Sequence, residues 1–238
     1  MQDLRYFNEE GRYLDQVWDV YRDYFTSQRS FLSCYRTIPS SERKNLFLMV
    51  LSRYRLLVLD GEYHLIGALN RQHLYVSYLD QTYKFISIMS LIEALFSEDE
   101  HVDFYQWLTM KKRKKQIFPI ADEKALDELY RQYKLEHGAR RVLRFFRELD
   151  EGPQSFLAAR VRIDNDHKPA EEVAQKLYIM RSEFVHQARL VLELNDGLMF
   201  SKRHGNVMYS TLSFKDLQLL FEHGILNHFC ILPDSRKI

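Results

Sequence analysis

The chain has 238 residues, enough for one large core, and 46% apolar and 28% charged residues, which excludes an intrinsically disordered protein. The formal net charge of +1 excludes a general attraction to nucleic acid, so any such attraction has to be local. Gly and Pro are scarce, with 8 and 5 copies. Few turn formers and long periodic stretches predict an all-α fold built from long helices.

No targeting or membrane-spanning segment is expected. Residues 1–6 are polar, unlike the start of a signal peptide, and no window approaches the roughly 18 apolar residues of a membrane span. Cys34 and Cys230 do not form a disulfide framework. We therefore expect free thiols in a reducing compartment and a cytoplasmic protein of bacteria or archaea.

The predicted helices begin with an N-terminal helical extension over residues 1–60, in two blocks separated by capping chemistry at Ile38–Ser41. A turn signal at Asp60-Gly61 precedes the main domain, residues 63–238. Its most apolar segment is Lys84–Phe96, which is apolar on nearly every side. Such a helix is buried by its neighbours, so we expect it to be the central one.

The second half of the chain is expected to continue as helices. The first runs from Asp122 to His137, and another from Pro169 to Leu194 after a loop over residues 164–169. A short hairpin is possible within Met199–Leu212. The capping box Ser213–Asp216 opens a last helix, which we expect to end at Gly224.

Two groups of cations are candidate contacts for RNA. One is a run of basic residues at 111–115, and the other is a row at helical spacing within 139–150. Guanidiniums one turn apart suit phosphates along a strand, because each can fork onto phosphate oxygens. The alternative is a solvated surface, in which Glu148 and Asp150 pair with the row. The candidate RNA-binding residues are Lys111, Lys112, Arg113, Arg140, Arg144 and Arg147.

The helix from Pro169 to Leu194 carries the residues best suited to catalysis. Its apolar stripe faces the core, and Tyr178, Ser182 and His186 lie roughly opposite. Arg181 is about 140° around the helix from His186, so one helix does not aim both at the same atom. Either the Arg side chain swings across, or a symmetric dimer brings two Arg/His pairs together.

An imidazole and a guanidinium together suit RNA cleavage. Imidazole exchanges its proton near neutral pH, so His186 can take a proton from a ribose 2′-hydroxyl. Arg181 stays charged and can hold the phosphate while negative charge builds on it. The 2′-oxygen then attacks its neighbouring phosphodiester without a metal, which requires RNA rather than DNA.

The segment Leu177–His186 (LYIMRSEFVH) resembles the Arg-x4-6-His signature of the HEPN superfamily (higher eukaryotes and prokaryotes nucleotide-binding). It looks most like the Apea-like branch, in which a Tyr precedes Arg-Ser. Ser90–Phe96 is similar to the first core helix of that branch, and the resemblance covers about residues 63–230. It implies a HEPN-like helical bundle that is commonly dimeric, with Arg and His at the subunit cleft. Many members are metal-independent endoribonucleases of toxin–antitoxin, abortive-infection or other anti-phage systems.

By position, the resemblance implies that Arg181 and His186 are catalytic and that Tyr178 and Ser182 line the site. Clearly catalytic members often carry Asn, Asp or His where this chain has Ser182. The alternatives are therefore a non-catalytic HEPN-like module that binds nucleic acid or a protein partner, and a pure assembly protein. Glu93 also belongs to the candidate site: a carboxylate in an apolar helix needs a partner if buried, such as an Arg or His of the motif helix. Otherwise it is partly exposed at a helix edge.

No cofactor or metal is expected. His223, His228 and Cys230 lack the spacing of a zinc site. The expected partners are RNA, a second copy of the chain, and an antitoxin or other defence-system protein, with no membrane.

Overall fold

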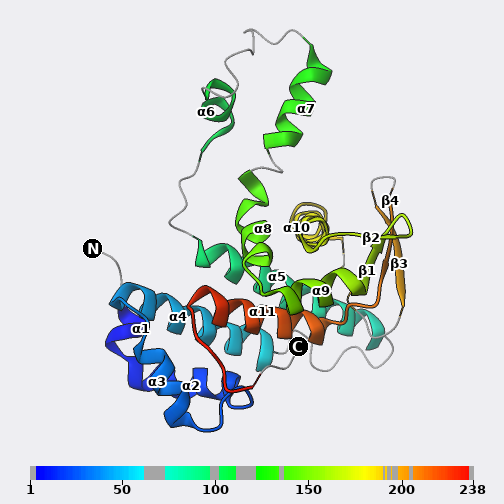
Figure 1. Ribbon diagram of the computed structural model, residues 1–238. Helices are drawn as coiled ribbons and strands as arrows, with labels where there is room; N and C mark the ends of the chain where they lie inside the picture. The colour runs from blue at the N-terminus through cyan, green and yellow to red at the C-terminus, as the bar shows by residue number, and fades with distance from the viewer. Residues whose placement is uncertain are drawn as a thin grey trace.

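The computed structural model describes residues 4–61, 73–96, 102–110, 122–133, 137–189, 191, 194, 198–203 and 206–235. The helices are α1 (Arg5–Asn8), α2 (Glu10–Tyr21), α3 (Gln28–Arg36), α4 (Ser41–Tyr54), the π-helix η1 (Arg55–Leu59), α5 (His73–Leu95), α6 (Phe104–Thr109), α7 (Glu123–Tyr133), α8 (Arg140–Arg147), α9 (Glu151–Arg160), α10 (Ala170–Gln187) and α11 (Phe214–His228). The strands are β1 (Val161–Ile163), β2 (Asp166–His167), β3 (Met199–Arg203) and β4 (Asn206–Ser210). Figure 1 shows α1 to α4 at one side of the molecule and the strands at the other.

The prediction of a mostly helical chain is confirmed, and the described residues also include a small sheet. The four strands form one antiparallel sheet in the order β2-β1-β4-β3. The hairpin suggested within Met199–Leu212 is present as β3 and β4. The loop expected at residues 164–169 instead contains β2, because Asp164 and Asn165 both adopt positive φ, 52° and 70°, and turn the chain back onto β1. Two such residues in a row form the tight turn of a hairpin.

The apolar helix predicted at Lys84–Phe96 lies at the centre of the described core. Its residues Phe85, Ile88, Met89 and Ile92 have no exposed surface. The helix to which they belong, α5, contacts α4, α8, α10 and α11. Because other helices surround α5, its side chains are apolar on nearly every side.

Two predicted helix ends are wrong. The helix starting after Pro169 ends at Gln187, not Leu194, because Ala188 turns into the left-handed region with φ 54°. The backbone N–H of Val191 then donates to Thr82 Oγ1 of α5 at 3.1 Å, which holds the departing chain on the core.

The last helix does not stop at Gly224 but continues to His228. A Cβ at Gly224 would lie 2.1 Å from Phe145 Cζ, so this glycine leaves room for a ring of α8 rather than ending α11. The predicted capping box is confirmed, since the Ser213 hydroxyl and the Asp216 carboxylate each accept a backbone N–H.

The N-terminal helices pack on α11. Glu222 is buried, and its carboxylate accepts hydrogen bonds from Tyr24 at 2.7 Å and Tyr54 at 2.9 Å. Tyr21 donates to the Glu222 backbone carbonyl at 3.1 Å. Apolar side chains from both regions belong to one cluster. The boundary at residue 60 stays a prediction.

In the part of the chain that the structure describes, no helix combines the length and apolar character needed to cross a bilayer.

Candidate functional site at the α5–α10 contact

The structure joins two of the predicted site residues across helices. Arg181 Nη2 of α10 donates to Glu93 Oε2 of α5 at 3.1 Å, and their side chains are 21% and 24% exposed. Glu93 therefore has the cationic partner that a carboxylate in an apolar helix needs. Burial raises the pKa of Glu93, while the guanidiniums of Arg181 and then Arg141 lower it.

Arg181 keeps hydrogen-bonding capacity beyond this ion pair. Its Nε is buried and has no hydrogen-bond partner among the described residues. A guanidinium has five N–H donors in a planar fork, and a buried donor without an acceptor costs about 1–3 kcal/mol. The side chain is consequently positioned by Glu93 but not saturated by it.

Tyr178 lies half-buried beside this pair, one turn before Arg181 on α10. Burial raises the pKa of its hydroxyl, the Glu93 carboxylate raises it further, and Arg181 lowers it. A Cβ at Gly138 would come within 2.9 Å of the Tyr178 hydroxyl. Gly138 therefore leaves space for this phenol.

His186 lies in the last turn of α10, and its side chain is exposed. Val185 beside it is 50% exposed. The preceding residue Phe184 packs edge-on against Tyr83 of α5, with ring centroids 5.5 Å apart. The end of α10 is thus fixed to α5 on one side and presents the imidazole to solvent on the other. Ser182, one turn earlier, is half-buried.

The predicted arginine row borders a cleft of about 1330 Å³ between α8 and the first turns of α10. Two of its members are paired: Arg144 Nε donates to Glu148 at 2.7 Å and Arg147 Nη2 to Glu171 at 2.6 Å. Arg140 is exposed and has no ion pair with any described residue. The charged side chains that line the cleft are Arg140, Arg144, Arg147, Glu148, Glu171 and Glu172. Among the described residues that line the cleft, positively and negatively charged side chains are therefore equal in number.

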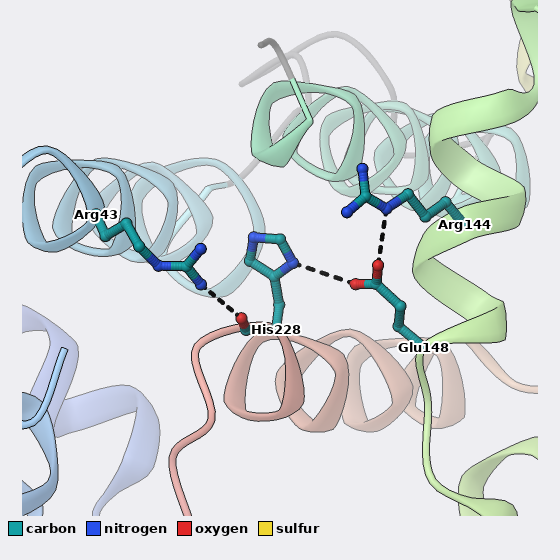
Figure 2. A network of polar contacts seen from close by, with 4 residues as sticks. All are labelled: Arg43, Arg144, Glu148 and His228. Atoms are coloured by element: carbon teal, nitrogen blue, oxygen red, sulfur yellow. Dashed lines mark hydrogen bonds and ion pairs between the residues drawn. The ribbon is translucent and has the colours of Figure 1, made fainter. Parts of the chain in front are cut away.

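Figure 2 shows the polar contacts that join Arg144 and Glu148 to His228 and His228 to Arg43 of α4. Its second oxygen lies 3.3 Å from Nδ1 of His228, and Arg43 of α4 donates to the His228 carbonyl at 2.8 Å. The Arg144 guanidinium also stacks 4.6 Å from the ring centroid of Phe96. Burial lowers the pKa of His228, and Glu148 opposes that shift. The sequence indicated Glu148 as a partner for the row but gave no sign of the link to His228 and Arg43.

One face of α10 runs from the cleft to the segment that contains Arg181 and His186. Gln175 lines the cleft. Ser182 and His186 follow it by seven and eleven residues, which places both within about 20° of the same line. Arg181 is turned about 120° away from that line, toward α5. One protomer therefore presents His186 on the cleft side and Arg181 on the Glu93 side.

Lys111, Lys112 and Arg113 lie outside the described residues. Within the described part of the chain, no three His, Cys, Asp or Glu residues group as metal ligands. Cys34 and Cys230 are free thiols.

The chain matches no protein-family model, and comparisons with curated proteins and with solved structures give no match either.

Proposed function

We propose that the chain is a metal-independent endoribonuclease of the HEPN type, working as a homodimer in prokaryotic defence or a toxin–antitoxin system. The observation that supports this best is the Glu93–Arg181 pair. It holds the partly exposed guanidinium of Arg181 on the helix that also carries an exposed imidazole five residues later. These are the two groups that cleavage through the ribose 2′-oxygen needs.

In this reaction His186 takes the proton from the 2′-hydroxyl. The 2′-oxygen bonds to phosphorus, the bond from phosphorus to the 5′-oxygen breaks, and the leaving oxygen receives a proton from a second imidazole. The products are a 2′,3′-cyclic phosphate and a 5′-hydroxyl end. Arg181 neutralises the charge on the phosphate oxygens during this exchange.

A dimer can bring Arg181 and His186 to the same phosphate, which a single α10 helix does not. Because Arg181 and His186 are about 140° apart on α10, a phosphate reached by both is most simply placed between two copies. A two-fold contact at the exposed end of α10 would bury Val185, which is 50% exposed, and bring two Arg/His pairs together.

The test is cleavage of end-labelled RNA by the purified full-length chain in excess EDTA. We expect cleavage by wild type, and loss of at least about 100-fold in Arg181→Ala and His186→Ala, the lower range for removing an acid–base catalyst. Gln187→Ala is the control, since this exposed neighbour of His186 has no assigned role. RNA with a 2′-deoxy nucleotide at the cut site should resist cleavage. Equal cleavage by wild type and both variants would reject the proposal.

A second candidate is a non-catalytic HEPN-like module that binds nucleic acid or a protein partner. It is favoured by the same ion pair, because Glu93 already neutralises the charge of Arg181. Salt-dependent RNA binding without turnover would support this module over the nuclease. Absence of any salt-dependent RNA affinity would leave a protein-binding or assembly role.

A further inference from the structure

One row of side chains crosses all four strands on the sheet face turned away from the core. The strand register aligns His167 of β2 with Arg162 of β1, Arg162 with Tyr209 of β4, and Tyr209 with Phe200 of β3. Successive side chains of a strand point to opposite faces, and the residues on either side of Arg162 are buried. This four-residue row therefore forms the outer face.

The row is a continuous surface of rings and a guanidinium. The rings of Phe200 and Tyr209 have centroids 6.1 Å apart and planes inclined by 32°. Arg162 Cζ lies 5.9 Å from the centroid of the Tyr209 ring. Phe200 is 67% exposed, and Leu198 beside it is 64% exposed. Exposed apolar side chains that lie together, as these do, mark a binding surface more often than isolated ones.

A hollow of about 260 Å³ adjoins the row, lined in part by Arg162, His167, Leu198 and Tyr209. It is smaller than the roughly 300–1,000 Å³ of pockets for larger ligands. His167 Nδ1 lies 3.1 Å from the Ala158 carbonyl oxygen, which can only accept, so Nδ1 carries the proton. In the tautomer with Nδ1–H, Nε2 is an acceptor, the kind of group that recognition of a base edge or a ribose hydroxyl uses.

The charges on this face favour an anion. Lys202 is exposed and follows Phe200 by two residues, so it lies on the same face. The nearby carboxylates have partners of their own: Asp166 pairs with Lys168 at 3.6 Å, Asp216 with Arg160 of the hollow at 3.8 Å, and Asp164 accepts from the Val207 backbone N–H at 2.8 Å. The cation of Arg162 adjoins the rings rather than forming a separate patch.

We propose that this sheet face binds single-stranded RNA, with bases stacked on Phe200 and Tyr209 and phosphates held by Arg162 and Lys202. Alternating rings and cations match the alternation of bases and phosphates in a single strand. Lys is depleted at protein–protein interfaces, whereas here Lys202 lies on the same face as the rings. The choice of RNA rests on the proposed function. In that function the sheet face would bind a part of the substrate RNA that lies away from the α5–α10 contact.

The test is fluorescence anisotropy with a labelled 12-nucleotide single-stranded RNA and the same sequence as a duplex. The full-length chain carries His186→Ala throughout, so that cleavage does not interfere. Phe200→Ala and Tyr209→Ala should each weaken single-strand binding roughly tenfold, and Phe200→Trp should retain it. Leu56→Ala is the control, because Leu56 is 65% exposed on η1. Arg162→Gln should reduce the slope of log affinity against log salt concentration by about 0.7, the value for one phosphate contact on a single strand.

Unchanged single-strand affinity in Phe200→Ala and Tyr209→Ala would overturn this assignment. So would a fall in oligomer mass in Phe200→Ala with RNA affinity intact, which would make the face an interface between copies. These outcomes are separable from failure of the nuclease, which is measured by the effect of His186→Ala on cleavage. Ring-dependent binding by a chain that never cleaves RNA would support the sheet face and reject the nuclease.

Discussion

Replacing Arg181 by Met tests the balance of forces at the α5–α10 contact. The substitution keeps an unbranched apolar side chain on α10 and removes the cation 3.1 Å from Glu93. In the wild type, burial raises the pKa of Glu93 and Arg181 is the larger of two cationic influences that lower it. Without Arg181, the pKa of Glu93 should rise further.

The sign of the pH dependence follows from this shift. Below the ordinary Glu pKa of 4.5 the carboxyl is protonated in both the folded and the unfolded chain, so the substitution costs little through charge. As the pH rises through the folded-state pKa, the unfolded chain releases its proton more easily, and stability is lost. Leaving a fully buried charge unpaired costs about 3–5 kcal/mol. Since Glu93 is 24% exposed, water screens part of this, and we expect about 1–3 kcal/mol at pH 8.

Urea unfolding followed by circular dichroism, at pH 5 and pH 8, measures this cost. Arg181→Met should lose more stability at pH 8 than at pH 5. Adding Glu93→Gln should recover much of the loss at pH 8 and flatten the pH dependence. Arg22→Met is the control, since the Arg22 side chain is 68% exposed. An equal deficit at both pH values, or no recovery in the double variant, would refute this account of the pair.

Three further substitutions test other features of the fold. Gly224→Ala should destabilise by about 1–2 kcal/mol in urea, because the gain in helix propensity does not offset a Cβ 2.1 Å from Phe145; Gly152→Ala, with nothing within 4 Å, should not. Ala188→Gly should raise the free energy of unfolding by about 1 kcal/mol, seen as a higher urea midpoint, since Gly adopts φ 54° without strain; an unchanged midpoint would contradict this. Burial lowers the pKa of His228 below 6.5, so stability should fall as the pH drops below 6.5 and the unfolded chain protonates first. In melting curves at pH 7.5 and 5.5, His228→Gln should therefore depend less on pH than wild type, and an equal dependence would be evidence against this role.

The helices were predictable where their cause is local. A stripe of apolar residues at helical spacing identified the buried segment of α5, whose Phe85 and Ile92 have no exposed surface. Capping hydroxyls identified the starts of α4 and α11, and in each the serine accepts a backbone N–H three residues later. These signals involve neighbours within one or two turns, so the sequence alone contains them.

The sheet was only half predictable because its pairing is not local. The hairpin of β3 and β4 has a compact sequence signal, whereas β1 has three residues, too few to show alternation. Its partner β4 is distant in the chain, with Ile163 opposite Met208. The Asp164-Asn165 turn was the one available signal, since both residues tolerate positive φ.

For the candidate site, the partner of Glu93 could be predicted but the state of the arginine row could not. A carboxylate within an apolar helix requires a cation, which limits the choices to a few residues. Arg144 pairs with Glu148 within one helical turn, as the alternative interpretation allowed. Arg147 instead pairs with Glu171 on another helix, which no local pattern indicates.

The pairing of the row changes where RNA affinity is expected to arise. A phosphate that binds Arg144 or Arg147 has to displace a carboxylate at 2.7 Å or 2.6 Å, so much of the gain from the new contact is lost. Arg140, without such a partner among the described residues, is the member that can bind a phosphate directly. Among the described residues of the cleft, Arg140 is then one guanidinium beside three carboxylates, and the net charge of +1 gives no general attraction. On the described residues, a chain that acts on RNA gains from a second contact region based on stacking as well as charge, and the row from His167 to Phe200 combines both.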